Sequence, residues 1–130
     1  MTRMAGKDAE GTILLIDDEP SVASAVRDLL GFFGYQVFIA SGGEEAIDFF
    51  RERSEEVNLI ILDLMMPDMG GEECLKQLRS ICPDVPTIIS SGYLGGSDTE
   101  ELLNCEIQGI LAKPFSPETL KRVVNEALGS

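Results

Sequence analysis

Five short apolar runs alternate along the chain with segments whose apolar residues recur at helical spacing. The runs cover residues 12–16, 35–40, 57–62, 85–89 and 107–112. Apolar residues on successive positions are typical of strands that are buried on both faces, as in a parallel sheet. The helical spacing covers residues 20–33, 44–50, 74–82, 98–105 and 117–128. The pattern therefore predicts five strand–helix units.

Regular alternation of this kind predicts an α/β fold of the doubly wound type. Its sheet has five parallel strands, and its five helices cover both faces through right-handed crossovers. Pro20 and Pro117 stand where first helical turns are expected, and Ser116 fits an N-cap. Residues 1–11 lack periodicity and are interpreted as a flexible leader, so that residues 12–130 form one domain.

Polar residues follow four of the five apolar runs. The first run ends in Asp17 and Asp18, the third in Asp63, the fourth in Ser91 and the fifth in Lys113. In open α/β sheets, ligands bind outside the carboxyl ends of the strands. If these strands are neighbours, three carboxylates, a hydroxyl and an amine meet in one cleft.

Three carboxylates in one cleft repel one another, and a hard divalent cation relieves that repulsion. Mg²⁺ prefers oxygen ligands and bridges carboxylates to phosphate oxygens. A lysine can hold a phosphoryl oxygen, and a serine hydroxyl can bond another. The cleft would therefore contain what phosphoryl transfer to a carboxylate needs: a nucleophile, a metal site and an opposing cation.

Four motifs, taken in order, resemble the receiver domain of two-component response regulators. They are residues 16–20 (IDDEP), 63–71 (DLMMPDMGG), 91–92 (SG) and 113–115 (KPF), and the resemblance spans residues 12–128. Each motif alone is weak, whereas the four together at strand ends are specific. The resemblance is to chemotaxis-regulator-like receivers and to the receivers of hybrid sensor histidine kinases. It implies a flavodoxin-like sheet with strand order 2-1-3-4-5.

The resemblance assigns a role to each matched position. It implies that Asp63 is the phosphoacceptor and that Asp17 and Asp18 hold Mg²⁺, with Asp18 favoured as the direct ligand. Met65 matches the position whose backbone carbonyl also binds the metal. Ser91 matches the switch hydroxyl, and is preferred to Ser90 because Gly92 follows it.

The fifth-strand end completes this assignment. Lys113 matches the lysine that contacts the phosphoryl group, and the resemblance implies a cis Lys113–Pro114 bond. One position departs from the family pattern, because Ile110 stands where an aromatic switch residue is common. Either another element of the chain then reports phosphorylation, or the conformational response is muted.

The predicted function is a phosphorylation-dependent signalling switch rather than an enzyme that turns over a separate substrate. The chain would catalyse only its own phosphorylation and dephosphorylation at Asp63. An alternative is a magnesium-dependent phosphohydrolase, but that class carries an Asp-x-Asp nucleophile strand and a cap domain, whereas Asp17 and Asp18 are adjacent. A constitutive adaptor that keeps the fold without the chemistry is a second alternative, which Ile110 leaves open.

Composition narrows the range of partners. Ten basic and 23 acidic residues give a net charge of −13, which opposes direct binding to nucleic acid. No apolar run approaches the roughly 20 residues of a membrane-spanning helix, and three cysteines, an odd number, suit the reducing cytoplasm. The chain has no histidine, so a phosphohistidine donor must lie elsewhere.

The resemblance therefore implies three kinds of partner. The donor is a histidine kinase or a histidine phosphotransfer protein, and the recipient of the signal is an output domain or a target protein. The last helix carries Lys121 and Arg122, which suit an acidic patch on a partner or a second copy of the chain. A homodimer through the last helix and the fifth strand is one such arrangement.

Overall fold

The computed structural model describes residues 11–64, 69–92 and 107–129. Its strands are β1 (Gly11–Ile16), β2 (Tyr35–Ala40), β3 (Leu59–Asp63), β4 (Thr87–Ser91) and β5 (Gly109–Ala112). Its helices are α2 (Pro20–Phe32), α3 (Gly43–Arg53), α4 (Gly71–Ile81) and α6 (Pro117–Ala127), with a short 3-10 helix, η1 (Ser54–Glu56). None of the helices in this part of the chain is long and apolar enough to span a bilayer.

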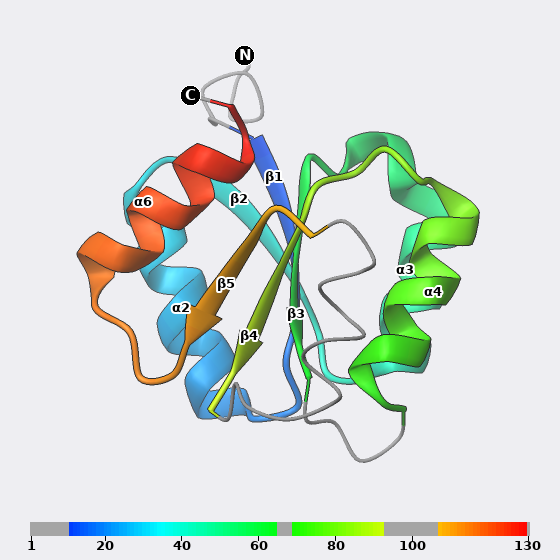
Figure 1. The fold of residues 1–130 in the computed structure, drawn as a ribbon, viewed down its shortest axis with the longest axis horizontal. Helices are drawn as coiled ribbons and strands as arrows, with labels where there is room; N and C mark the ends of the chain where they lie inside the picture. Colours follow the sequence, from blue (N-terminus) through cyan, green and yellow to red (C-terminus); the bar gives the residue numbers. More distant parts are fainter. Residues whose placement is uncertain (1–10, 65–68, 93–106, 130) are drawn as a thin grey trace.

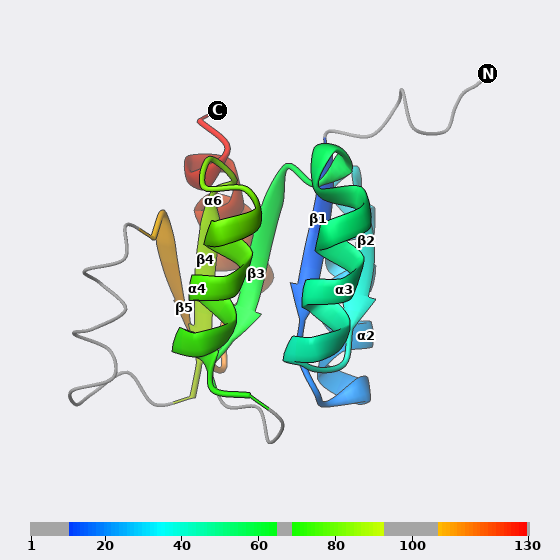
Figure 2. The same ribbon diagram turned by 90° about the vertical axis from the view of Figure 1, so that its right-hand side faces the viewer.

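The five strands form one parallel sheet in the order β2-β1-β3-β4-β5, which confirms the order implied by the resemblance. Helices α2 and α6 cover one face of this sheet, and α3 and α4 cover the other (Figure 1). The arrowheads of the strands point to the same edge of the sheet (Figures 1 and 2). The carboxyl ends of the strands therefore share one edge, as the sequence predicted.

Each face of the sheet has its own hydrophobic core. Alternate strand residues point to opposite faces, so β1 sends Leu14 and Ile16 toward α3 and α4, and Ile13 and Leu15 toward α2 and α6. All four of these side chains are 3% exposed or less. Burial on both faces explains why the strand sequences are apolar on successive positions rather than on every second one.

Three strands, β3, β4 and β5, begin two residues later than the apolar runs that predicted them. The third run begins at residue 57, but β3 begins at Leu59, because Ser54–Glu56 forms η1 and the amide of Val57 donates back to the Ser54 carbonyl. The fourth run begins at residue 85, but β4 begins only after Pro86, which has no amide hydrogen for the sheet ladder.

Two predictions concern segments that are outside the described residues. The predicted helix at 98–105 lies there, so the described residues contain four of the five expected α-helices. The predicted leader also lies there, except for Gly11, which is the first residue of β1. The cap predicted at Ser116 is confirmed, because its Oγ accepts the amide of Thr119 at 3.1 Å.

Candidate functional site

Asp17 and Asp63 bring their carboxylates together because β1 and β3 are neighbouring parallel strands. Asp63 is the last residue of β3, and Asp17 follows the last residue of β1. Oxygens of Asp17, Asp18 and Asp63 lie within 4.8 Å of one another. Asp17 is 4% exposed and Asp63 is 6% exposed, so two of the three acids are largely removed from water. The structure thus places together the three carboxylates that the sequence assigned to one cleft.

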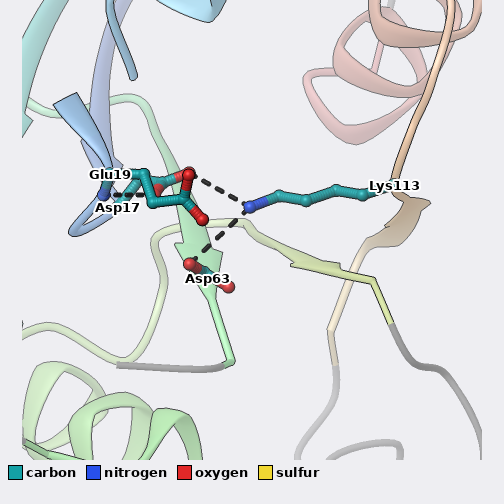
Figure 3. A network of polar contacts seen from close by, with 4 residues as sticks. All are labelled: Asp17, Glu19, Asp63 and Lys113. Carbon is teal, nitrogen blue, oxygen red and sulfur yellow. Dashed lines mark hydrogen bonds and ion pairs between the residues drawn. The ribbon is translucent and has the colours of Figure 1, made fainter. Parts of the chain in front are cut away.

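Lys113 approaches these acids from β5, on the far side of the cleft. Its Nζ lies 3.2 Å from Asp17 Oδ2 and 3.6 Å from Asp63 Oδ2 (Figure 3). Burying a carboxylate without a counter-charge costs several kcal/mol, so the lysine is what makes this buried pair tolerable. The Lys113–Pro114 peptide bond is cis, as the resemblance implied.

The two oxygens of Asp17 have different partners. Oδ1 accepts the backbone amide of Glu19 at 3.0 Å, and Oδ2 accepts Lys113 Nζ (Figure 3). The Asp17 amide donates to the Ala40 carbonyl of β2 at 3.0 Å. Both side-chain oxygens of Asp17 are therefore held in place. The bond to Glu19 is local in sequence, whereas the bond to Lys113 depends on the fold. Asp18, in contrast, is only half-buried.

Backbone hydrogen bonds tie the remaining polar positions into the same edge. The amide of Lys113 donates to the Ser91 carbonyl at 2.8 Å, and the amide of Leu64 donates to the Ser90 carbonyl at 3.1 Å. Ser90 and Ser91 are both buried, at 4% and 1% exposure. Burial therefore does not distinguish the predicted switch hydroxyl, Ser91, from its neighbour.

Met65 and Ile110 are the two remaining positions that the sequence singled out. Met65, whose carbonyl was predicted to bind the metal, lies outside the described residues. Ile110 is half-buried in β5 and pairs with Ile89 of β4.

The donor set fits a magnesium ion. Mg²⁺ binds oxygen ligands at 2.0–2.1 Å, so opposite ligands of an octahedral ion stand about 4.2 Å apart. The three carboxylate oxygens lie within 4.8 Å of one another, so small side-chain movements bring them within reach of one ion. The candidate ligands are carboxylate oxygens, with Lys113 beside them. Magnesium prefers such hard oxygen ligands, whereas softer metals prefer nitrogen or sulfur.

Sequence comparison agrees with this geometry. The profile of the response regulator receiver domain family matches residues 13–125. A sensor kinase, CckA of Brucella abortus (strain 2308), is 36% identical over 117 residues, which are 90% of this chain and 12% of the kinase. The chain spans less than half the length of this kinase and of other curated relatives that it matches.

Solved structures are similar over nearly the whole chain. The chemotaxis protein CheY4 of Vibrio cholerae has a TM-score of 0.84 and 30% identity, covering 92% of this chain and 100% of that one. The receiver domain of the sensor histidine kinase PA1611 of Pseudomonas aeruginosa PAO1 has a TM-score of 0.84 and 26% identity, covering 94% and 100% of the two chains. That structure has a magnesium ion coordinated in its active-site cleft.

Proposed function

The chain belongs to the response regulator receiver domain family, and from that premise we propose that Asp63 is the residue at which this signalling switch accepts a phosphoryl group. The observation that carries this proposal is the cluster of Asp17, Asp18 and Asp63 with Lys113 at the carboxyl edge of the sheet. Asp63 is the acid at the end of the central strand, β3, and it faces the lysine across the cleft.

The transfer step takes its nucleophile from this chain and its phosphoryl group from the donor. An oxygen of the Asp63 carboxylate attacks the phosphorus of a donor phosphohistidine. The O–P bond forms as the N–P bond breaks, and the imidazole nitrogen keeps the electron pair. Hydrolysis of the resulting acyl phosphate releases inorganic phosphate and restores Asp63. The chain therefore catalyses only its own phosphorylation and dephosphorylation.

Asp17, Asp18 and Asp63 would hold Mg²⁺, with the backbone carbonyl of Met65 as a further ligand. The bound ion supplies positive charge beside the transferring phosphoryl oxygens. Both oxygens of Asp17 already accept hydrogen bonds, which favours Asp18 as the direct ligand and Asp17 as the residue that orients the site. Lys113 is placed to leave Asp17 and contact a phosphoryl oxygen on Asp63, because its Nζ is within 3.6 Å of both acids.

The readout begins at Ser91, whose hydroxyl would bond the phosphoryl group. The backbone of Lys113, directly after β5, donates to the Ser91 carbonyl, so a shift of one strand end would be carried to the other. Because Ile110 replaces the usual aromatic residue, the response would reach the partner through β5 and α6 without an aromatic rotamer change.

The composition of the chain supports the proposed partners. It contains no histidine, so the donor is a histidine kinase or a histidine phosphotransfer protein outside these 130 residues. The recipient is an output domain or a target protein, and a second copy could pair through β5 and α6. We place the switch in the cytoplasm, on the strength of its three cysteines, and expect no direct contact with nucleic acid at a net charge of −13.

Replacement of Asp63 tests the proposal. We expect the wild-type chain to gain one phosphoryl group from acetyl phosphate only when Mg²⁺ is present, as read by intact-protein mass spectrometry. Asp63→Asn keeps the shape of the side chain but removes the nucleophile, so labelling should fall to background. Asp84→Asn removes an exposed acid from the loop before β4 and should label like the wild type. Undiminished labelling of Asp63→Asn would contradict the assignment.

A further inference from the structure

Gly71, the first residue of α4, lies against the residue that follows the proposed phosphoacceptor. Its amide donates to the Leu64 carbonyl at 3.3 Å, which closes the loop between β3 and α4. A Cβ at position 71 would stand 2.9 Å from Leu64 Cα and 2.8 Å from Leu64 Cδ2. Carbon atoms in ordinary contact stand about 3.5–4.0 Å apart. Only glycine therefore allows this close approach.

Leu64 is held on its other side as well. Its amide donates to the Ser90 carbonyl of β4 at 3.1 Å, and its side chain packs against the core beneath α3 and α4. Leu64 is thus fixed between β4 and the first residue of α4. Asp63 is its covalent neighbour, so the position of the Asp63 carboxylate depends on where Leu64 is held.

The far end of the same loop has a second close contact. A Cβ on Gly43, at the start of α3, would stand 2.9 Å from Met69 Cβ and 3.0 Å from Met69 Sδ. Gly70, between the two contacts, differs from both neighbours, because a Cβ there would meet nothing within 4 Å. The backbone of Gly70 is extended, with φ −64° and ψ 148°, so alanine fits there without strain.

We propose that Gly71 is a positioning residue for the Asp63 carboxylate, through its close contact with Leu64. This inference rests on the proposed function, because it concerns the geometry of the same site. A Cβ at position 71 would have to displace the Leu64 backbone by about half an ångström to reach an ordinary contact distance. Mg²⁺ demands near-ideal geometry at 2.0–2.1 Å, so a shift of that size in one ligand is large.

The test compares two adjacent alanine substitutions, Gly71→Ala and Gly70→Ala, in the whole chain. Each protein is titrated with magnesium chloride alone, and binding is followed by amide chemical shifts. We expect Gly71→Ala to weaken Mg²⁺ affinity about tenfold, the range found when groups that orient metal ligands are changed, and Gly70→Ala to match the wild type. In metal-free protein, the Leu64 amide should exchange with solvent faster in Gly71→Ala alone.

A general loss of stability would lower the unfolding midpoint but leave the Mg²⁺ affinity of the folded molecules unchanged. Equal affinity in Gly71→Ala and the wild type would overturn the inference, and so would equal weakening by both substitutions. If the wild type itself binds no Mg²⁺, the proposed function fails instead.

If Gly71→Ala does not fold, Leu64→Ala decides, because it removes the side-chain part of the contact with Gly71 without introducing any overlap. A weaker Mg²⁺ affinity than that of the wild type supports the inference, and an affinity equal to that of the wild type overturns it.

Discussion

At the scale of single residues, the structure leaves two candidates, Ser90 and Ser91, for the hydroxyl that bonds the phosphoryl group. Ile88 belongs to the core under α2 and α6, and Ile89 to the core under α3 and α4. Strict alternation therefore directs Ser90 to the α2 side and Ser91 to the α3 side. The same rule directs Asp63 to the α2 side, because Ile61 lies in that core. Alternation favours Ser90 as the partner of Asp63, whereas the family motif favours Ser91.

We predict that the motif is right, because Ser91 is the last residue of β4 and its carbonyl accepts the amide of Lys113. Ser91→Ala should still bind beryllofluoride, a phosphoryl analogue, but should lose most of the amide shift changes that it causes in β5 and α6. A hydrogen bond to a charged group is worth about 1.5–3 kcal/mol, so the active population should fall roughly tenfold or more. Ser90→Ala is the matched control, and a larger loss there would exchange the two roles.

At the scale of secondary structure, α2 contains a residue that works against its own helix. Gly31 is exposed, one residue from the end of α2, and a Cβ there would meet nothing within 4 Å. A glycine in a helix costs about 0.5–1 kcal/mol relative to alanine, because it loses more backbone entropy on folding. The carbonyl of Gly31 accepts the amide of Gly34 at 3.0 Å, but alanine would keep this backbone hydrogen bond. Nothing described around Gly31 therefore requires a glycine.

We therefore expect Gly31→Ala to stabilise the chain by about 0.5 kcal/mol, the lower end of that range, since the position is near the helix terminus. Urea unfolding followed by circular dichroism measures the change. Ala25→Gly, at an exposed position in the same helix, is the reverse control and should destabilise by a similar amount. A lower unfolding free energy for Gly31→Ala would show that the glycine has a role that its surroundings do not reveal.

The elements also show how far sequence reasoning reaches. The run at 35–40 coincides with β2, although this edge strand is less buried than the central strands, whereas the run at 107–112 begins two residues before β5. The predicted start of β4 was two residues too early, because the apolar pattern included Val85 and Pro86. Pro86 has no amide hydrogen to donate to a neighbouring strand. Helix starts at Pro20 and Pro117 were correct, because proline suits the first helical turn.

The candidate site was predicted as a set of residues but not as a geometry. Asp17, Asp63 and Lys113 could be named because each stands at or directly after the end of an apolar run, and the ends of parallel strands share an edge. The clamp of Gly71 on Leu64 could not be derived, because it depends on the approach of α4 to β3 in three dimensions. The sequence shows only two adjacent glycines, at positions 70 and 71. It does not indicate which of the two lies in close contact with another residue.

At the scale of the whole molecule, the net charge of −13 is unevenly distributed. Three acids are gathered at the carboxyl edge of the sheet, where Lys113 partly offsets them. On α6, in contrast, exposed Lys121 and Arg122 stand among the exposed acids Glu118 and Glu126. Arg122 and Glu126 lie 3.4 Å apart on this helix. A surface with both signs in alternation is complementary to its own copy across a two-fold axis.

This distribution makes self-association through β5 and α6 testable by charge reversal. We expect the beryllofluoride-loaded chain to form dimers in sedimentation equilibrium, and the double substitution Lys121→Glu with Arg122→Glu to weaken them at least about tenfold, because like charges then face each other. Lys76→Glu reverses an exposed lysine on α4, where it pairs with Glu72 at 3.0 Å, and should leave the dimer unchanged. Since the paired charges are exposed, added salt should also weaken the wild-type dimer. Two outcomes would show that this α6 surface is not the contact between copies. One is a wild type that stays monomeric at every concentration, and the other is a Lys76→Glu variant whose dimer is weakened as much as that of the double substitution. Binding of Lys121 and Arg122 to an acidic partner would then be the remaining proposal for this surface.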